Sequence, residues 1–292
     1  MSRAQEIAAQ IGSLNELSEI VTAIRAMASV QMRQSQSSLD AVRDYIEIIR
    51  RALGEAIALC HGGDGDSGGK VKSLPGLVVF GAEHGFCGAF NEPLIRTAID
   101  ASRTEPSPYL IFVGTRGAQR SSEHGLRPNL TLPMATHSGG VGATARRVAA
   151  EIYRMFVERT LTSIEVLYMR TVAGRESGPQ RLRLLPLEPA PVAQNGSAMP
   201  PLVNMAPRRL RDELAAEYMF AMLEAIAMES FASENAARFR TMEAAHENID
   251  TKSSQLGHMA RRMRQEAVTG EILEIIGGAE AMKRMNPFGA RH

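Results

Sequence analysis

An apolar heptad pattern near each end of the chain constrains the fold more than any other feature of the sequence. Between residues 6 and 59 there is no proline, and apolar side chains recur at alternating spacings of three and four residues. A stripe sustained over roughly seven heptads is typical of a coiled coil and not of a globular amphipathic helix. The stripe runs through Ile7, Ile11, Leu14, Ser18, Val21, Arg25, Ala28, Met32, Ser35, Leu39, Val42, Ile46, Ile49, Leu53 and Ala56, and only Ser18, Arg25 and Ser35 interrupt its apolar character.

A second stripe begins after Arg208 and reaches about Ile276, where Gly277 and Gly278 predict the end of the helix. At 1.5 Å per residue, the two helices would be about 80 Å and over ~100 Å long. Such stripes are most simply buried against each other, so we predict an antiparallel coiled coil of the two chain ends. The longer second helix should project beyond its partner and need another protein around it. Its stripe runs through Leu214, Tyr218, Ala221, Ala225, Met228, Ala232, Phe239, Met242, Ile249, Leu256, Ala260, Met263 and Ala267, and it is interrupted at Asn235, His246 and Ser253.

The sequence between the stripes predicts a small Rossmann-like α/β domain inserted into the coiled coil. Short apolar runs indicate strands, and they alternate with helical patterns, which favours a mostly parallel sheet. The strands are expected at 77–80, 109–113 and 164–168, and the helices near 92–102, 116–123 and 143–160.

The composition along the chain predicts five segments. Glycines concentrated between 62 and 69 indicate a flexible linker, and prolines between 182 and 207 indicate an extended exit from the α/β domain. The predicted segments are an N-terminal coiled-coil helix at 1–59, a linker at 60–74, the α/β domain at 75–190, an extended connection at 191–207, and a C-terminal helix with its tail at 208–292.

Charge and cysteine content exclude several classes of protein. The net charge is only +1, whereas nucleic-acid binders usually carry a clear positive excess. The two cysteines are too few for a secreted disulfide framework and indicate a reducing compartment. No run of about 18 apolar residues exists, so we expect no membrane-spanning helix.

Two short strings resemble catalytic motifs, but other interpretations are favoured for both. The string GDSGG at 65–69 is that of a trypsin-like nucleophile, yet it lies in the predicted linker with no β-barrel pattern around it. The Gly-Gly-Lys at 68–70 lacks the upstream glycine and the Ser or Thr of a P-loop. The seven histidines show no metal-binding spacing. We therefore expect no metal, no cofactor and no catalytic residue.

The loop at 81–88 is the third motif, because it joins a predicted strand to a predicted helix. It does not match G-x-G-x-x-G, and no third group of a triad accompanies His84 and Cys87. We interpret it as a structural turn with a buried thiol, leaving an enzyme that uses Cys87 or His84 as an alternative.

Three stretches together resemble the gamma subunits of F-type ATP synthases. Residues 20–33 (IVTAIRAMASVQMR) are similar to that family's opening helix, although Gln31 stands where lysine is usual, and 85–91 (GFCGAFN) resemble its GLCGGFN loop. The most specific match is SENAAR at 233–238, followed by Arg264-Gln265 and TGEILEIIGGA at 269–279. The resemblance spans essentially the whole chain in the family's order, with departures typical of a divergent bacterial branch.

The resemblance implies a central rotor shaft that couples transmembrane proton or sodium flow to ATP synthesis or hydrolysis, without catalysis of its own. It implies as partners the hexameric ring of alpha and beta subunits, the epsilon subunit and the membrane rotor ring of c subunits, and no nucleic acid. It also implies a peripheral location, without membrane insertion, on the cytoplasmic face of a bacterial inner membrane. A coiled-coil structural adaptor with a globular α/β head is the alternative function.

The resemblance also suggests site residues. Contacts between rotor and ring map onto Arg264, Gln265, Thr269, Ile24 and Arg25. The family loop maps onto a structural turn that contains Gly85, Cys87, Gly88 and Asn91.

Overall fold

The structure is a computed structural model that describes residues 3–60, 74–103, 107–158, 160–171, 178–187 and 201–285. The glycine-rich linker, including GDSGG and Gly-Gly-Lys, lies outside these residues, as do much of the proline-rich connection and most of the tail. The elements are α1 (Arg3–Leu59), β1 (Leu74–Phe80), α2 (Asn91–Ser102), β2 (Tyr109–Val113), α3 (Thr115–Glu123), β3 (Leu130–Leu132), η1 (Ser138–Gly140), α4 (Val141–Val157), β4 (Leu161–Arg170), β5 (Gly178–Leu185) and α5 (Pro207–Met285).

The chain forms two compact units, one made of Met1–Arg25 with Met242–His292 and the other of Ala26–Thr241. This division follows spatial contacts, so both long helices contribute to each unit. The two units do not correspond to the five segments predicted along the sequence, so the boundaries of those segments stay a prediction.

The larger unit contains a five-stranded sheet in the order β3-β2-β1-β4-β5. β1 pairs in parallel with β2 and with β4, β2 pairs in parallel with β3, and β5 is antiparallel to β4. The three predicted strands are present, and the mostly parallel sheet is confirmed. β3 and β5 were not predicted. Residues 182–185 belong to β5 and do not yet leave the domain, which corrects the predicted start of the extended exit.

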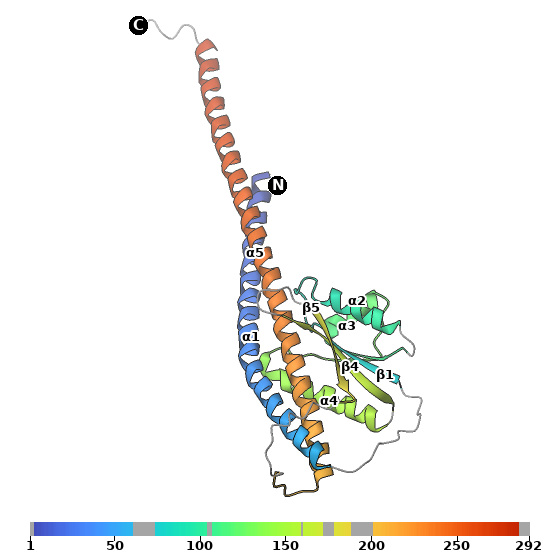
Figure 1. The fold of residues 1–292 in the computed structure, drawn as a ribbon. Coiled ribbons are helices and arrows are strands. Elements are labelled where there is room, and N and C mark those ends of the chain that lie inside the picture. Colours follow the sequence, from blue (N-terminus) through green and yellow to red (C-terminus); the bar gives the residue numbers. More distant parts are fainter. Residues whose placement is uncertain are drawn as a thin grey trace. The chain divides into compact units, whose positions relative to one another are not determined.

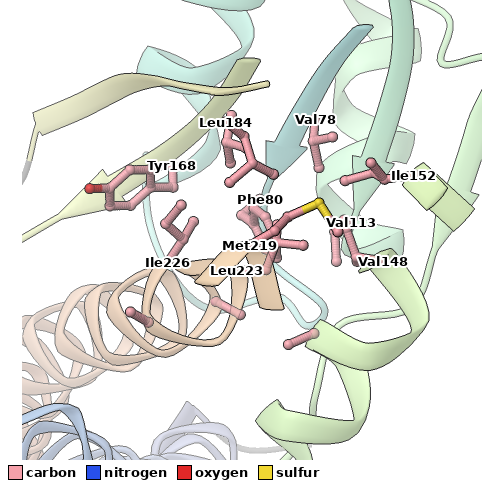
Figure 2. Close-up of a cluster of buried hydrophobic side chains, with 14 of the residues drawn as sticks. Val78, Phe80, Val113, Val148, Ile152, Tyr168, Leu184, Met219, Leu223 and Ile226 are labelled. Atoms are coloured by element: carbon pink, nitrogen blue, oxygen red, sulfur yellow. The ribbon is translucent and has the colours of Figure 1, made fainter. Parts of the chain in front are cut away.

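Helices cover both faces of this sheet (Figure 1). Alternation along β1 sends Leu77 and Val79 to the face covered by α2 and α3, and Val78 and Phe80 to the opposite face. Figure 2 shows the second face, where Val78 and Phe80 meet residues of α4 and α5 such as Ile152 and Leu223. The predicted α/β class with long terminal helices is confirmed.

The part of α5 in this unit is buried on nearly all sides. Residues 225–236 are buried apart from Glu229, because α1 packs against one side of the helix and the sheet against another. From α1, Leu39, Ile46 and Ile49 enter the same core. A helix buried all round needs small and apolar residues on every face, which explains the four alanines and two serines between 225 and 236.

The smaller unit confirms the antiparallel pairing of the helices. Ser18 Oγ lies 3.5 Å from Nδ1 of His246, and the Arg25 guanidinium lies 3.0 Å from the Glu243 carboxylate. A later residue of α1 therefore contacts an earlier residue of α5, as expected for antiparallel helices. Val21, Met242 and Ile249 form an apolar cluster between these two contacts.

The end of α5 projects beyond its partner helix within this unit. From Arg264 to Gly278 every residue is exposed. The predicted helix end at Gly277 and Gly278 is wrong, because α5 continues to Met285. Glycine weakens a helix by about 1 kcal/mol but does not end it without a left-handed cap. No helix among the described residues has an apolar stretch long enough to cross a membrane.

Candidate functional sites: a loop–helix junction and the exposed end of α5

The loop at 81–90 follows β1 at the carboxyl edge of the sheet. Because β2 and β4 flank β1 on opposite sides, the strand order reverses there, and a doubly wound domain usually binds its ligand at such a point. Here α5 occupies that position. The Ser230 hydroxyl donates to the carbonyl oxygen of Phe80 at 3.1 Å, and both groups are buried. The place where a related fold would hold a nucleotide is filled by the protein's own helix.

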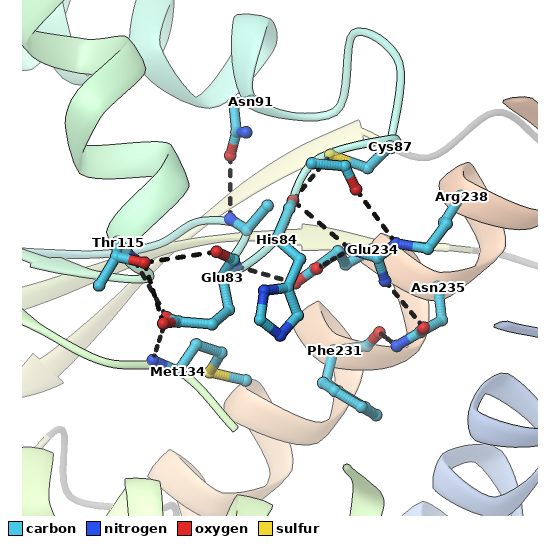
Figure 3. Close-up of polar contacts among 12 residues, drawn as sticks. Glu83, His84, Cys87, Asn91, Thr115, Met134, Phe231, Glu234, Asn235 and Arg238 are labelled. Carbon is cyan, nitrogen blue, oxygen red and sulfur yellow. Dashed lines mark hydrogen bonds and ion pairs between the residues drawn. The ribbon is translucent and has the colours of Figure 1, made fainter. Parts of the chain in front are cut away.

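Glu234 and Arg238 of α5 make an ion pair that binds this loop (Figure 3). The Glu234 side chain is 3% exposed, and its carboxylate accepts from the backbone N–H of Glu83 at 3.4 Å. Arg238 donates through Nε to the carbonyl oxygen of Gly85 at 3.2 Å. Burial raises the pKa of Glu234, while Arg238 and the N–H groups of Glu83 and His84 act in the opposite direction. Both side chains of the pair, four residues apart on α5, therefore hold the loop against the helix.

Asn235, which interrupts the predicted stripe, completes the junction. Its Nδ2 donates to the carbonyl oxygen of Phe231 at 3.0 Å, and its Oδ1 accepts from Arg238 at 2.9 Å. This buried amide is therefore satisfied and holds the guanidinium in place.

Glu83 ties the loop to two neighbouring segments. Its carboxylate accepts from the backbone N–H of Thr115 at 3.0 Å and of Met134 at 2.7 Å. The first contact places a negative charge at the start of α3, where the helix dipole favours it. On the other side of the loop, the buried Asn91 accepts from the N–H of Ala82 at 2.9 Å. Polar contacts thus hold the segments that follow β1, β2 and β3 together.

Cys87 has the properties of a buried structural thiol. Burial raises its pKa to about 11, with the Glu234 charge acting in the same direction. Its Sγ contacts the carbonyl oxygen of His84 at 3.7 Å. A thiol that stays protonated near pH 7 is a poor nucleophile, so the geometry favours the structural interpretation over the cysteine-enzyme alternative.

The turn itself has two residues with left-handed backbone angles. Gly88 has φ +58°, and a Cβ there would lie 2.8 Å from the Thr241 hydroxyl. Phe86 has φ +62° and is 67% exposed, an uncommon conformation for a bulky residue. No close neighbour surrounds a Cβ placed on Gly85. Of the turn residues proposed from the sequence, Gly88, Cys87 and Asn91 are therefore tied to their surroundings, and Gly85 contributes its carbonyl oxygen.

The proposed ring-contact residues on α1 face its partner helix. Ile24 is half-buried beside the Val21 cluster, and Arg25 pairs with Glu243. Both thus have a role inside the coiled coil, and their contact with a ring stays a prediction.

The proposed ring-contact residues on α5 lie on its exposed end. Arg264, Gln265 and Thr269 are all exposed, and the Thr269 hydroxyl donates to the Gln265 carbonyl oxygen at 2.8 Å. Gln265 and Thr269 are four apart and share one side, whereas Arg264 points about 100° away from Gln265. An apolar stripe on the same segment contains Val268, Ile272, Ile275 and Ile276.

Comparison with known proteins decides the family. A family model described as ATP synthase matches residues 3–282. The chain belongs to this family.

Among the described residues, no group of three His, Cys, Asp or Glu side chains is arranged to hold a metal ion.

Curated relatives within the family are gamma chains. The ATP synthase gamma chain of Symbiobacterium thermophilum is 27% identical over 278 residues, covering 94% of this chain and 96% of the relative. That of Caldicellulosiruptor saccharolyticus is 26% identical, covering 95% and 98%. These matches extend over nearly the full length of both proteins.

Solved structures share the fold. A chain of the Euglena gracilis mitochondrial ATP synthase, in a structure of OSCP, F1 and the c-ring, has a TM-score of 0.67 at 18% identity and covers 99% of this chain and 97% of its own length. A chain of the Tetrahymena thermophila central stalk and c-ring has a TM-score of 0.54 at 17% identity, covering 77% and 99%.

Sequence reasoning missed the roles of Glu83, Glu234 and Arg238. The i, i+4 spacing of Glu234 and Arg238 inside an apolar helix was a usable signal, because charges buried in a helix need a partner. Glu83 gave no such signal, since its partners are backbone N–H groups of distant segments.

Proposed function

We propose that this chain is the central rotor shaft of an F-type ATP synthase, coupling transmembrane ion flow to ATP synthesis or hydrolysis in an alpha/beta ring. Membership of the family and full-length similarity to gamma chains support the proposal. Its partners would be the alpha and beta subunits, the epsilon subunit and the ring of c subunits. The shaft would be peripheral, on the cytoplasmic face of a bacterial inner membrane.

The observation that carries the proposal is the unpaired, partly apolar end of α5. Ile272, Leu273 and Ile275 are each more than half exposed, and among the described residues no neighbour buries any part of α5 from Arg264 to Gly278. A row of exposed apolar side chains usually marks an interaction site, and a ring that encloses the helix would bury it on all sides. The adaptor alternative accounts for two long helices but not for the full-length family match.

The junction at 81–91 supports a non-catalytic role. The crevice at the carboxyl edge of the sheet is filled by α5, and Cys87 is held as a protonated thiol. We propose that the α/β domain serves as the attachment for the epsilon subunit and the c ring, while catalysis takes place in the ring subunits.

We further propose that Arg264, Gln265 and Thr269 form a catch that engages the ring at particular rotary angles, and that the stretch of α1 around Ile24 and Arg25 faces the beta subunits of the ring. Guanidinium and amide groups make directional hydrogen bonds to carboxylates. Such a bond is worth little on an exposed surface, but about 1.5–3 kcal/mol where a charged group is desolvated.

The double variant Arg264→Ala/Gln265→Ala tests the catch in a complex reconstituted with alpha, beta and rotor-ring subunits. We expect normal assembly and a fall in ATP turnover or ion pumping of roughly tenfold, since 1.4 kcal/mol corresponds to a factor of ten. Assembly, hydrolysis and pumping are measured separately.

The control is Arg262→Ala, which removes an exposed arginine about 200° around the same helix from Arg264. It should leave all three quantities close to wild type. Wild-type values for the double variant would show that these residues are ordinary helix surface. A chain that never assembles with alpha and beta subunits would refute the rotor function itself.

A further inference from the structure

One acidic side chain joins three parts of the larger unit. Glu229 lies on α5 between Met228 and Ser230, which are both buried, and its own side chain is 11% exposed. A carboxylate at such a place loses most of its hydration, so it needs charged partners to remain.

Its partners come from two different elements. Arg43 Nη2 of α1 donates to Glu229 Oε1 at 2.5 Å. Arg170, at the end of β4, places its Nε 3.6 Å from Glu229 Oε2. A single carboxylate therefore links the N-terminal helix, the C-terminal helix and the sheet.

The two contacts are not equally tight. Among the described residues, Glu229 Oε2 is the buried side-chain polar atom without a hydrogen bond, although it faces Arg170. Asp40 shares Arg43 at 3.6 Å, and the nearby Tyr168 has a raised pKa, first from burial and then from the Glu229 charge. We name Arg43, Glu229 and Arg170 the carboxylate clamp.

Stability alone does not explain the clamp. Apolar residues of similar size often stabilise a buried site as well as an ion pair does. What an ion pair adds is direction, because a charged hydrogen bond holds a fixed geometry whereas apolar contacts tolerate sliding. The clamp lies where the sheet packs on the helix pair, and sliding there would change the angle between them.

We propose that Glu229 is a positioning residue that fixes the α/β domain at one angle on the helix pair, so that torque passes between them without slack. This inference rests on the proposed rotor function. It concerns only the larger unit, in which all three residues lie.

The test measures angular fluctuation in the assembled complex with its catalytic ring immobilised. A bead is attached to the α/β domain through Ser122→Cys, an exposed position on α3, in a Cys60→Ser background. We expect Glu229→Gln and Arg43→Gln each to widen the angular variance of the paused rotor roughly twofold, because each removes a directional link. The double variant should match Glu229→Gln alone, because that substitution already removes the charge with which Arg43 pairs.

The matched control is Glu213→Gln, which changes an exposed carboxylate on α5 that pairs with Arg209 of the same helix. It should leave the variance at the wild-type value. An unchanged variance in assembled Arg43→Gln would overturn the inference, and Arg43 is half-exposed, so this variant decides even if Glu229→Gln fails to fold. An equal widening in Glu213→Gln would also overturn it. A wild-type rotor that does not turn would instead refute the rotor function.

Discussion

Replacing Arg238 with methionine should lower the free energy of unfolding of the larger unit by about 3–5 kcal/mol near pH 8, because it leaves the Glu234 carboxylate buried without its partner. Methionine keeps much of the aliphatic length of arginine, so lost packing contributes little. Hydrogen exchange of the buried amides of β1, which lies beside the junction, measures the change.

The loss should be smaller at pH 5 than at pH 8. Burial raises the pKa of Glu234 above its ordinary value of 4.5, so the folded protein keeps this proton at a pH where the unfolded chain has released it. Stability therefore falls as pH rises from 4.5 through the folded pKa. Without Arg238, which acts to lower that pKa, the fall continues to higher pH and becomes larger.

A second substitution distinguishes a buried charge from lost packing. Adding Glu234→Gln to Arg238→Met removes the charge while keeping an acceptor for the Glu83 N–H, and it should restore more than half of the loss. Arg240→Met, an exposed change on the same helix, should stay within about 0.5 kcal/mol of wild type. No recovery in the double variant, or no pH dependence in the single one, would contradict this account.

Replacing Gly114 with alanine should destabilise the same unit by about 2–6 kcal/mol, the sum of a strained backbone and an overpacked contact. Gly114 has φ +113°, and a Cβ there would lie 2.5 Å from the carbonyl oxygen of Gly81 and 2.8 Å from that of Ala82. Both obstacles are backbone atoms, so no side chain can rotate away. The same hydrogen-exchange measurement reports the change.

Gly125→Ala separates the two causes. Gly125 also has a positive φ, +80°, but a Cβ there meets no atom within 4 Å. We expect a loss of only about 1–2 kcal/mol, from the backbone conformation alone. Equal losses at the two positions would show that the approach of β1 and β2 does not require glycine at 114.

The long helices and their antiparallel pairing could be predicted from the sequence, because a heptad stripe requires only local periodicity to be recognised. Every stripe residue of α1, from Ile7 to Ala56, is buried or half-buried. The unpaired end of α5 could also be predicted, because the second stripe is longer than the first. The family also followed from local strings, and the match over residues 3–282 confirms it.

Elements without a strong local signal were missed. β3 has three residues and β5 reads GPQRLRLL, so neither shows an apolar run. Both are edge strands, stabilised by hydrogen bonds to β2 and β4 that the sequence does not display. The helical continuation through Gly277 and Gly278 was missed for a similar reason, since a glycine pair is a statistical stop and not a steric one.

The sequence by itself determined the periodic elements, the order of the family motifs and the absence of a phosphate loop, because each depends on residues close together in the chain. Only the tertiary structure decided what the polar residues do. Glu83, Glu229 and Glu234 each contact segments far away in sequence, and their partners include backbone N–H groups, which every residue but proline carries. The energy of a buried carboxylate depends on which donors the fold brings to it, so its role becomes visible only when the chain is folded.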